Sequence, residues 1–102
     1  MDVRRLAEAL KSGSVTVVDV REAWELELCR IEPCTHLPLS EFAERYHDLL
    51  PPDGHYALLC HHGMRSAQAT HFLASKGYAD VANVEGGIDA WATEVDPSMS
   101  RY

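Results

Sequence analysis

The sequence predicts a three-layer α/β domain with a small, mainly parallel sheet and helices on both faces. Short β-branched segments alternate along the chain with segments whose apolar residues recur at helical spacing. The strand segments are almost continuously apolar, as expected where helices cover both faces of a parallel sheet. Because the chain has 102 residues and no repeat or internal linker, we expect a single domain over residues 1–102.

The N-terminal third of the chain is predicted to form a helix, a buried strand and a second helix. Apolar residues recur every three or four positions within residues 3–11, and Gly13 then marks the end of that helix. Residues 15–20 are mostly β-branched, which favours a buried strand. A short helix is expected over residues 22–29.

The middle of the chain is predicted to contribute one short strand and one helix. Pro33 and Pro38 argue against a continuous central strand, so we expect extended structure only around residues 35–37. Ser40 is a favourable N-cap residue, and the helix that follows it is expected to run to about Leu50.

The second half of the chain repeats the alternation of strands and helices. Strands are expected over residues 56–59 and 81–84, because both segments are short and apolar. Helices are expected over residues 66–76 and 88–94. The tail after about residue 96 is expected to be loosely ordered.

Composition excludes several classes of function. The formal net charge is −7, and the nine Lys and Arg residues are scattered, so no basic stripe is present to bind nucleic acid. No apolar run approaches the roughly 18 residues of a membrane span. The first residues read as an amphipathic helix and lack the features of a signal or transit peptide. We therefore expect a cytoplasmic protein that binds neither nucleic acid nor membranes.

The three cysteines predict neither a disulfide framework nor a metal site. They are odd in number and contain no pair separated by two residues. Cys29 and Cys34 are expected to be structural thiols, although either could resolve a persulfide on Cys60. His61 and His62 follow Cys60, but no second cysteine or carboxylate recurs at ligand spacing, so we expect no metal and no other cofactor.

The segment from Cys60 to Ser66 carries the pattern most typical of chemistry. Cys60 ends a predicted strand, and a helix is expected to begin near Ser66, so the cysteine lies where sites form in parallel sheets. Loop N–H groups, the positive end of that helix and Arg65 would all stabilise a thiolate, and Gly63 permits the torsions of a tight loop. The same features would bind the oxyanion of a substrate such as thiosulfate. The alternative is an unreactive thiol buried at the strand end.

Four segments resemble the rhodanese family, in the family's order and over nearly the whole chain. They are residues 19–22 (Asp-Val-Arg-Glu), residues 36–40 (His-Leu-Pro-Leu-Ser), residues 60–66 and residues 84–91, which include Glu-Gly-Gly-Ile. Leu39 departs from the pattern because the family usually has glycine there. The family's first strand also has no room ahead of the first helix, so we expect it to be reduced or absent.

The resemblance implies a sulfurtransferase of the thiosulfate sulfurtransferase type. It makes Cys60 the nucleophile, which holds the outer sulfur of a donor as a persulfide and passes it to a thiophilic acceptor. It also implies a substrate-binding loop made of His61, His62, Gly63, Met64 and Arg65. Sulfurtransferases of the family have four residues between the cysteine and the arginine, as here, whereas phosphatase-type members have five.

The resemblance also implies the partners. Donors would be thiosulfate, small persulfides or a protein persulfide, and acceptors would be cyanide in the test tube and thiols or a sulfur-carrier protein in the cell. The loop has His61 and His62 where some thiosulfate-specific members carry a second cation, which makes thiosulfate less expected as the natural donor. The alternative function is a non-catalytic, rhodanese-like module that binds a partner protein. The intact spacing between Cys60 and Arg65 argues against it.

Further residues are candidates for support of the site: Asp19, Arg21, Ser66 and Gly86. We expect Asp19 to cap nearby amides and Arg21 to pair with a carboxylate close to the site. The backbone of Gly86 follows a strand end and could line the pocket. Trp24 and Trp91 are expected to be core aromatic residues.

Overall fold

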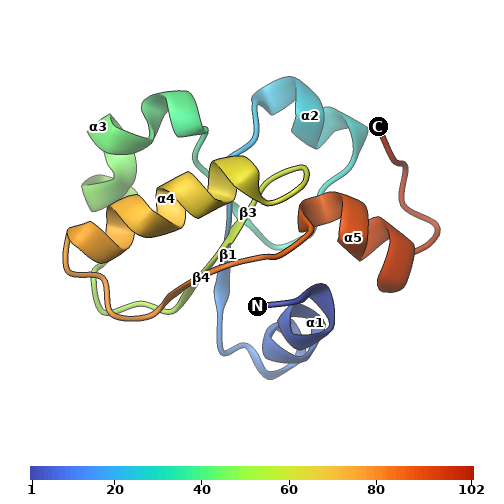
Figure 1. Ribbon diagram of the computed structural model, residues 1–102, viewed down its shortest axis with the longest axis horizontal. Coiled ribbons are helices and arrows are strands. Elements are labelled where there is room, and N and C mark those ends of the chain that lie inside the picture. Colours follow the sequence, from blue (N-terminus) through green and yellow to red (C-terminus); the bar gives the residue numbers. More distant parts are fainter.

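The computed structural model describes residues 1–102 and forms a four-stranded sheet flanked by helices (Figure 1). Along the chain the elements are α1 (Val3–Ser12), β1 (Thr16–Asp19), α2 (Ala23–Leu28), β2 (Thr35–His36), α3 (Leu39–Leu49), β3 (Tyr56–Leu59), α4 (Met64–Ser75), β4 (Val81–Asn83) and α5 (Gly87–Glu94). All pairings are parallel, in the order β2-β1-β3-β4. The predicted α/β fold with a parallel sheet is confirmed.

The central strands β1 and β3 pair along their whole length. Their register joins Thr16 to Tyr56 at one end and Asp19 to Leu59 at the other. The edge strands β2 and β4 are shorter and pair with β1 and β3. Because the strands are parallel, the residues that follow Asp19 and Leu59 emerge at the same edge of the sheet, where sites form in such folds.

Side-chain alternation along β3 divides the core into two clusters. Leu58 and Cys60 face one cluster, which includes side chains of α3 and α4. Ala57 and Leu59 face the other cluster, which includes side chains of α1 and α5. Helices α3 and α4 therefore cover one face of the sheet, and α1 and α5 cover the other. This alternation places the Cys60 side chain on the face covered by α4.

The helix bounds follow local signals except at two helix starts: α3 begins at Leu39 with Pro38 as its N-cap, so the expectation that Ser40 is the N-cap was wrong, and α4 begins earlier than expected. The side chain of Asp2 caps α1 by accepting from the Arg5 N–H at 2.9 Å, and Gly13 ends α1 with φ at 68°. Helix α4 begins at Met64, two residues before the predicted start near Ser66. Gly63 has φ at 104°, a torsion that favours glycine, and it turns the chain directly into the helix.

The C-terminal tail packs against the domain, although loose order was expected. Arg101 pairs with Asp89 of α5, with Nε and Oδ1 2.9 Å apart, and the Tyr102 ring lies parallel to the His61 ring with centroids 3.9 Å apart. Figure 1 shows the chain end returning to the neighbourhood of α2. Nothing in the pattern of the tail's own residues predicts these contacts.

Trp24 lies at the surface, so its assignment to the core was wrong. It is 59% exposed and meets the Tyr102 ring edge-on, with centroids 6.1 Å apart. Helix α2 follows β1 and lies beyond the carboxyl edge of the sheet instead of covering a face (Figure 1). The apolar residues of this helix therefore have less of the sheet to cover.

The region ahead of α1 contains no strand. The Met1 backbone nevertheless bonds to the edge at β4, with its N–H groups donating to Asn83 O at 3.0 Å and its carbonyl accepting from the Glu85 N–H at 2.8 Å. None of the helices combines the length and apolar character needed to cross a membrane.

Candidate active site

The Cys60 sulfur lies beneath the N-terminus of α4, among hydrogen-bond donors. The N–H groups of Gly63 and Ser66 donate to Sγ at 3.1 and 3.3 Å. The Ser66 hydroxyl oxygen lies 3.2 Å from the same sulfur. Donors around a sulfur stabilise its ionised form more than its neutral form. Cys60 is 1% exposed and touches the core cluster, yet its sulfur is directed at the amides.

Several N–H groups of the loop between β3 and α4 make no hydrogen bond within the chain. The N–H groups of His61, His62, Met64 and Arg65 have no acceptor within the chain. Those of Met64 and Arg65 belong to the first turn of α4, where helix N–H groups point out of the helix end. The loop therefore presents unused donors, together with the positive end of a helix dipole, beside the thiol.

Helix α5 holds the loop from behind through the loop's carbonyl groups. The Ile88 N–H donates to Cys60 O at 2.9 Å, and the Asp89 N–H donates to His61 O at 3.1 Å. A Cβ on Gly87 would lie 2.4 Å from His61 O and 2.5 Å from Cys60 O, so only glycine permits this approach. Gly87 thus lies against the carbonyls of Cys60 and His61, whereas the predicted Gly86 lies next to Gly63.

Arg65 is bound by a carboxylate. Its Nη1 and Nη2 donate to the two carboxylate oxygens of Glu25 at 2.7 and 2.8 Å. The Glu25 side chain is 4% exposed, and these bonds to Arg65 lower its pKa to about 2. The guanidinium charge is therefore balanced within the chain instead of facing the pocket alone.

The buried pair of Arg21 and Asp19 supports the site without touching the sulfur. Arg21 Nη2 donates to Asp19 Oδ2 at 2.7 Å and to the carbonyl of Cys29 at 2.8 Å. Asp19 Oδ1 also accepts from the Arg21 N–H at 3.0 Å. Both side chains are fully buried. The pair ties the end of β1 to the end of α2, the helix that carries Glu25.

The two histidines of the loop differ in their surroundings. The His61 ring is stacked between the His62 ring and the Tyr102 ring, with both centroid distances 3.9 Å. Burial, followed by the neighbouring His62, lowers the pKa of His61, and its Nε2 has no hydrogen-bond partner. His62 is exposed, and Met64 is 79% exposed at the rim.

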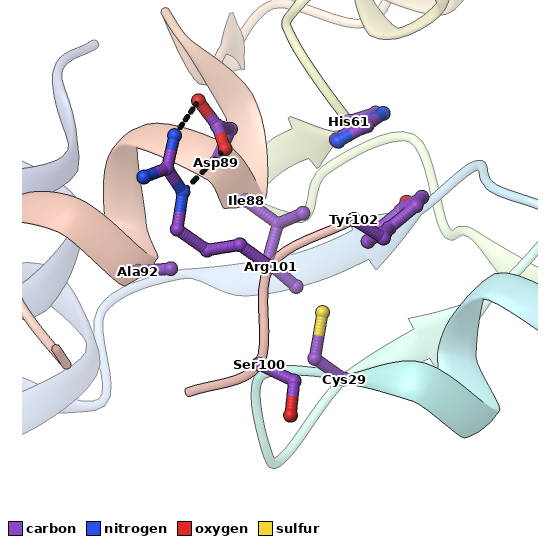
Figure 2. Close-up of a pocket in the computed structure, with 8 residues that line it drawn as sticks. All are labelled: Cys29, His61, Ile88, Asp89, Ala92, Ser100, Arg101 and Tyr102. Carbon is purple, nitrogen blue, oxygen red and sulfur yellow. Dashed lines mark hydrogen bonds and ion pairs between the residues drawn. The ribbon is translucent and has the colours of Figure 1, made fainter. Parts of the chain in front are cut away.

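The tail completes one side of the site. Figure 2 shows it passing between α5 and Cys29, with Tyr102 beside His61. The Tyr102 hydroxyl donates to Glu25 Oε1 at 2.8 Å and accepts from Arg21 Nη1 at 3.0 Å. Burial raises the pKa of Tyr102 to about 12.

The structure adds residues that were not among the predicted site residues: Glu25, Asn83, Gly87 and Tyr102. Asn83 ends β4 at the carboxyl edge of the sheet, so its position could have been found from the predicted strand. Gly87 is the next residue after Gly86, which was among the predicted supporting residues of the site. No signal in the sequence indicated Tyr102. Cys29 and Cys34 are free thiols, both half-buried, and no three His, Cys, Asp or Glu side chains cluster to hold a metal ion.

Fold and site together define a class of α/β domains that carry a cysteine in a short, donor-lined loop between a strand and a helix. The family model for the rhodanese-like domain matches residues 2–94. The chain belongs to the rhodanese-like family.

Similar proteins agree with this assignment. The thiosulfate sulfurtransferase GlpE of Pseudomonas syringae is 34% identical over 89 residues, which cover 85% of this chain and 81% of that protein. The chloroplastic rhodanese-like/PpiC domain-containing protein 12 of Arabidopsis thaliana is 36% identical over 89 residues, but this chain spans only 30% of its length. A rhodanese-related protein of Thermoplasma volcanium has a crystal structure with a TM-score of 0.85 and 39% identity, over 93% of this chain and 91% of that chain.

Proposed function

We propose that this protein is a sulfurtransferase that carries a sulfane sulfur as a persulfide on Cys60. The observation that carries the proposal is the donor set around Sγ: the N–H groups of Gly63 and Ser66 and the Ser66 hydroxyl. A persulfide places its outer sulfur about 2 Å beyond Sγ. The unused N–H groups of the loop are the candidates to receive that second sulfur.

The reaction divides into two displacements. In the first, the Cys60 thiolate attacks the outer sulfur of the donor; a bond forms between the two sulfurs, and the donor's own bond to that sulfur breaks. The electron pair leaves with the donor remnant, sulfite from thiosulfate or a thiolate from a persulfide. In the second, a thiophilic acceptor attacks the outer sulfur and Cys60 leaves as a thiolate. No metal or organic cofactor takes part.

The charge balance of the site supports a persulfide over thiosulfate as the preferred donor. Arg65 is neutralised by Glu25, and the loop carries no second permanent cation. A dianion such as thiosulfate would therefore meet N–H donors but no free positive charge. We expect a small persulfide to give the higher kcat/KM, and we expect added salt not to lower thiosulfate turnover, because no free positive charge attracts the dianion and the chain carries a net charge of −7.

The rim of the site supports a protein as the acceptor in the cell. Met64 and Trp24 are 79% and 59% exposed. Exposed large apolar side chains next to a reactive group are typical of a surface that a partner covers. A thiol protein or a sulfur-carrier protein fits this rim. Because free thiols persist in reducing compartments, the cytoplasm is the proposed location.

Mass spectrometry of the intact protein tests the proposal. After exposure to thiosulfate or a small persulfide, the wild type should gain one sulfur, roughly 32 Da, which a thiol removes. Cys60→Ser should gain none and should have no thiosulfate:cyanide activity, whereas Cys34→Ser should behave as the wild type. Sulfur gained by Cys60→Ser would refute the mechanism. Wild type without sulfur uptake from any donor would favour a binding module.

A further inference from the structure

Asn83 links the end of β4 to both sides of the Cys60 loop. Its Nδ2 donates to the Gly63 carbonyl at 3.1 Å. Its Oδ1 accepts from the Ser66 hydroxyl at 2.5 Å. Gly63 and Ser66 are the two residues whose N–H groups bond to Cys60 Sγ. Asn83 is therefore linked to the sulfur indirectly, through Gly63 on its Nδ2 side and through Ser66 on its Oδ1 side. It does not contact the sulfur itself.

The two partners of Asn83 fix where the hydrogen of Ser66 lies. A carbonyl oxygen only accepts, so Nδ2 must face Gly63 and Oδ1 must face Ser66. Oδ1 also only accepts, so the single hydroxyl hydrogen of Ser66 lies on the line to Asn83. In the 3.2 Å contact between Cys60 Sγ and Ser66 Oγ, the sulfur is then the donor. This arrangement belongs to the neutral thiol.

Ionisation of Cys60 requires a different arrangement of the same three groups. A thiolate has no hydrogen to donate, so its contact with Ser66 Oγ is favourable only if the hydroxyl rotates toward the sulfur. The rotation takes the hydrogen away from Asn83 Oδ1. The proton of the thiol leaves to solvent, and Ser66 keeps its own hydrogen. The acceptor strength of residue 83 therefore opposes the formation of the thiolate.

We propose that Asn83 is a positioning residue that sets, through the Ser66 hydroxyl, how readily Cys60 becomes a thiolate. A neutral amide holds the hydroxyl hydrogen while Cys60 is a thiol and releases it to the sulfur when Cys60 ionises. The amide also donates to the Gly63 carbonyl, which accepts from the Ala67 N–H as well. The catalytic meaning of this inference rests on the proposed function, whereas its test needs no sulfur transfer.

Two substitutions separate this role from a structural one, because both remove the bond from Nδ2 to Gly63. Asn83→Asp keeps an acceptor for Ser66 and makes it a stronger one, so the thiolate should form at higher pH. Asn83→Leu removes the acceptor and frees the hydroxyl for the sulfur, so the thiolate should form at lower pH. A residue that merely braced the loop would shift both variants in the same direction.

The measurement is the rate of Cys60 alkylation by iodoacetamide as a function of pH. Trypsin yields a peptide of residues 46–65 in which Cys60 is the single cysteine, so its labelling can be followed by mass. The other charged or titratable groups around the loop and around residue 83 stay the same in every variant: the Met1 ammonium, Asp19, Arg21, Glu25, His61, His62, Arg65, Glu85, Asp89 and Tyr102. We expect the midpoint to rise by about one pH unit in Asn83→Asp and to fall in Asn83→Leu.

Ser66→Ala provides the control for the route through the hydroxyl. The alanine keeps the N–H that donates to Sγ, but it has no hydrogen to share. In this background Asn83→Leu should leave the midpoint unchanged, and Asn83→Asp should retain only its direct effect of charge. If leucine does not fit, Asn83→Ala takes its place in the same comparison.

Midpoints that shift in the same direction, or an effect of Asn83→Leu that survives Ser66→Ala, would overturn the inference. If sulfur loading fails while the midpoints move as described, the proposed function is at fault and this inference stands.

Discussion

Replacement of Glu25 by glutamine should lower the free energy of unfolding at neutral pH, and this loss should become smaller at acid pH. The Glu25 carboxylate is 4% exposed and is bound by Arg65, by the Tyr102 hydroxyl and by the Glu22 N–H. These contacts lower its pKa from 4.5 to about 2. A shift of this size corresponds to a free energy of at most about 3 kcal/mol in favour of the folded state.

The direction of the shift defines the pH window. Because the pKa of Glu25 is lowered on folding, its contribution is complete above about pH 4.5 and is lost as the pH falls toward 2. At pH 7 the free energy of unfolding of Glu25→Gln should therefore be lower than that of the wild type by up to about 3 kcal/mol. At pH 3 roughly 2 kcal/mol of that difference should have disappeared.

Urea unfolding followed by circular dichroism at several pH values between 7 and 3 measures this difference. Glu27→Gln is the matched control, since Glu27 lies on the same helix, is exposed and has no ion pair. Its difference from the wild type should be small at every pH. A deficit of Glu25→Gln that stays the same from pH 7 to pH 3 would show that the carboxylate's charge is not what stabilises this part of the structure.

Other substitutions test the supports of the site. Gly87→Ala should lower the free energy of unfolding by at least about 3 kcal/mol and should lower sulfur loading. Gly13→Ala is the control, because Gly13 has a similar φ but no neighbour within 4 Å, and it should cost about 1 kcal/mol. Equal costs would contradict the close approach of Gly87 to the loop carbonyls. Arg21→Met leaves Asp19 buried without its partner, so a loss of about 3–5 kcal/mol is expected in urea unfolding, and a loss below about 1 kcal/mol would refute that role. Tyr102→Phe removes the hydroxyl's bonds to Glu25 and Arg21, so it should be less stable than the wild type at pH 8. Because burial raises the pKa of Tyr102 to about 12, the wild type loses stability as the pH rises from 10 toward 12, and thermal unfolding should show the deficit of the variant shrinking above pH 10.

The fold and the position of Cys60 at the end of β3 could be predicted because both depend on short-range patterns. The apolar residues of β3 indicate a buried strand, Cys60 ends it, and Gly63 permits the turn into the next helix. Alternation along the strand then decides which face the sulfur takes. These features need no knowledge of distant residues.

The partners of the loop could not be predicted because they come from distant parts of the chain. Arg65 meets Glu25, 40 positions away, and Tyr102 reaches the same carboxylate from 77 positions away. Locally, Glu25 differs from the exposed Glu27 as the N3 residue of the capping box with Glu22, and that position does not indicate a partner 40 positions away. The choice of partner is made by how α2, α4 and the tail meet beyond the edge of the sheet, which is a property of the folded chain.

The hydrogen bonds from α5 to the loop carbonyls limit how the substrate preference of the proposed sulfurtransferase can change. The carbonyls of Cys60 and His61 are already occupied by the Ile88 and Asp89 N–H groups. Rotation of either peptide plane would break one of these bonds, so the backbone around the sulfur is a constant frame. New preferences would then have to arise from exchange of the outward side chains, chiefly at positions 62 and 64, while the frame and its thiol stay as they are.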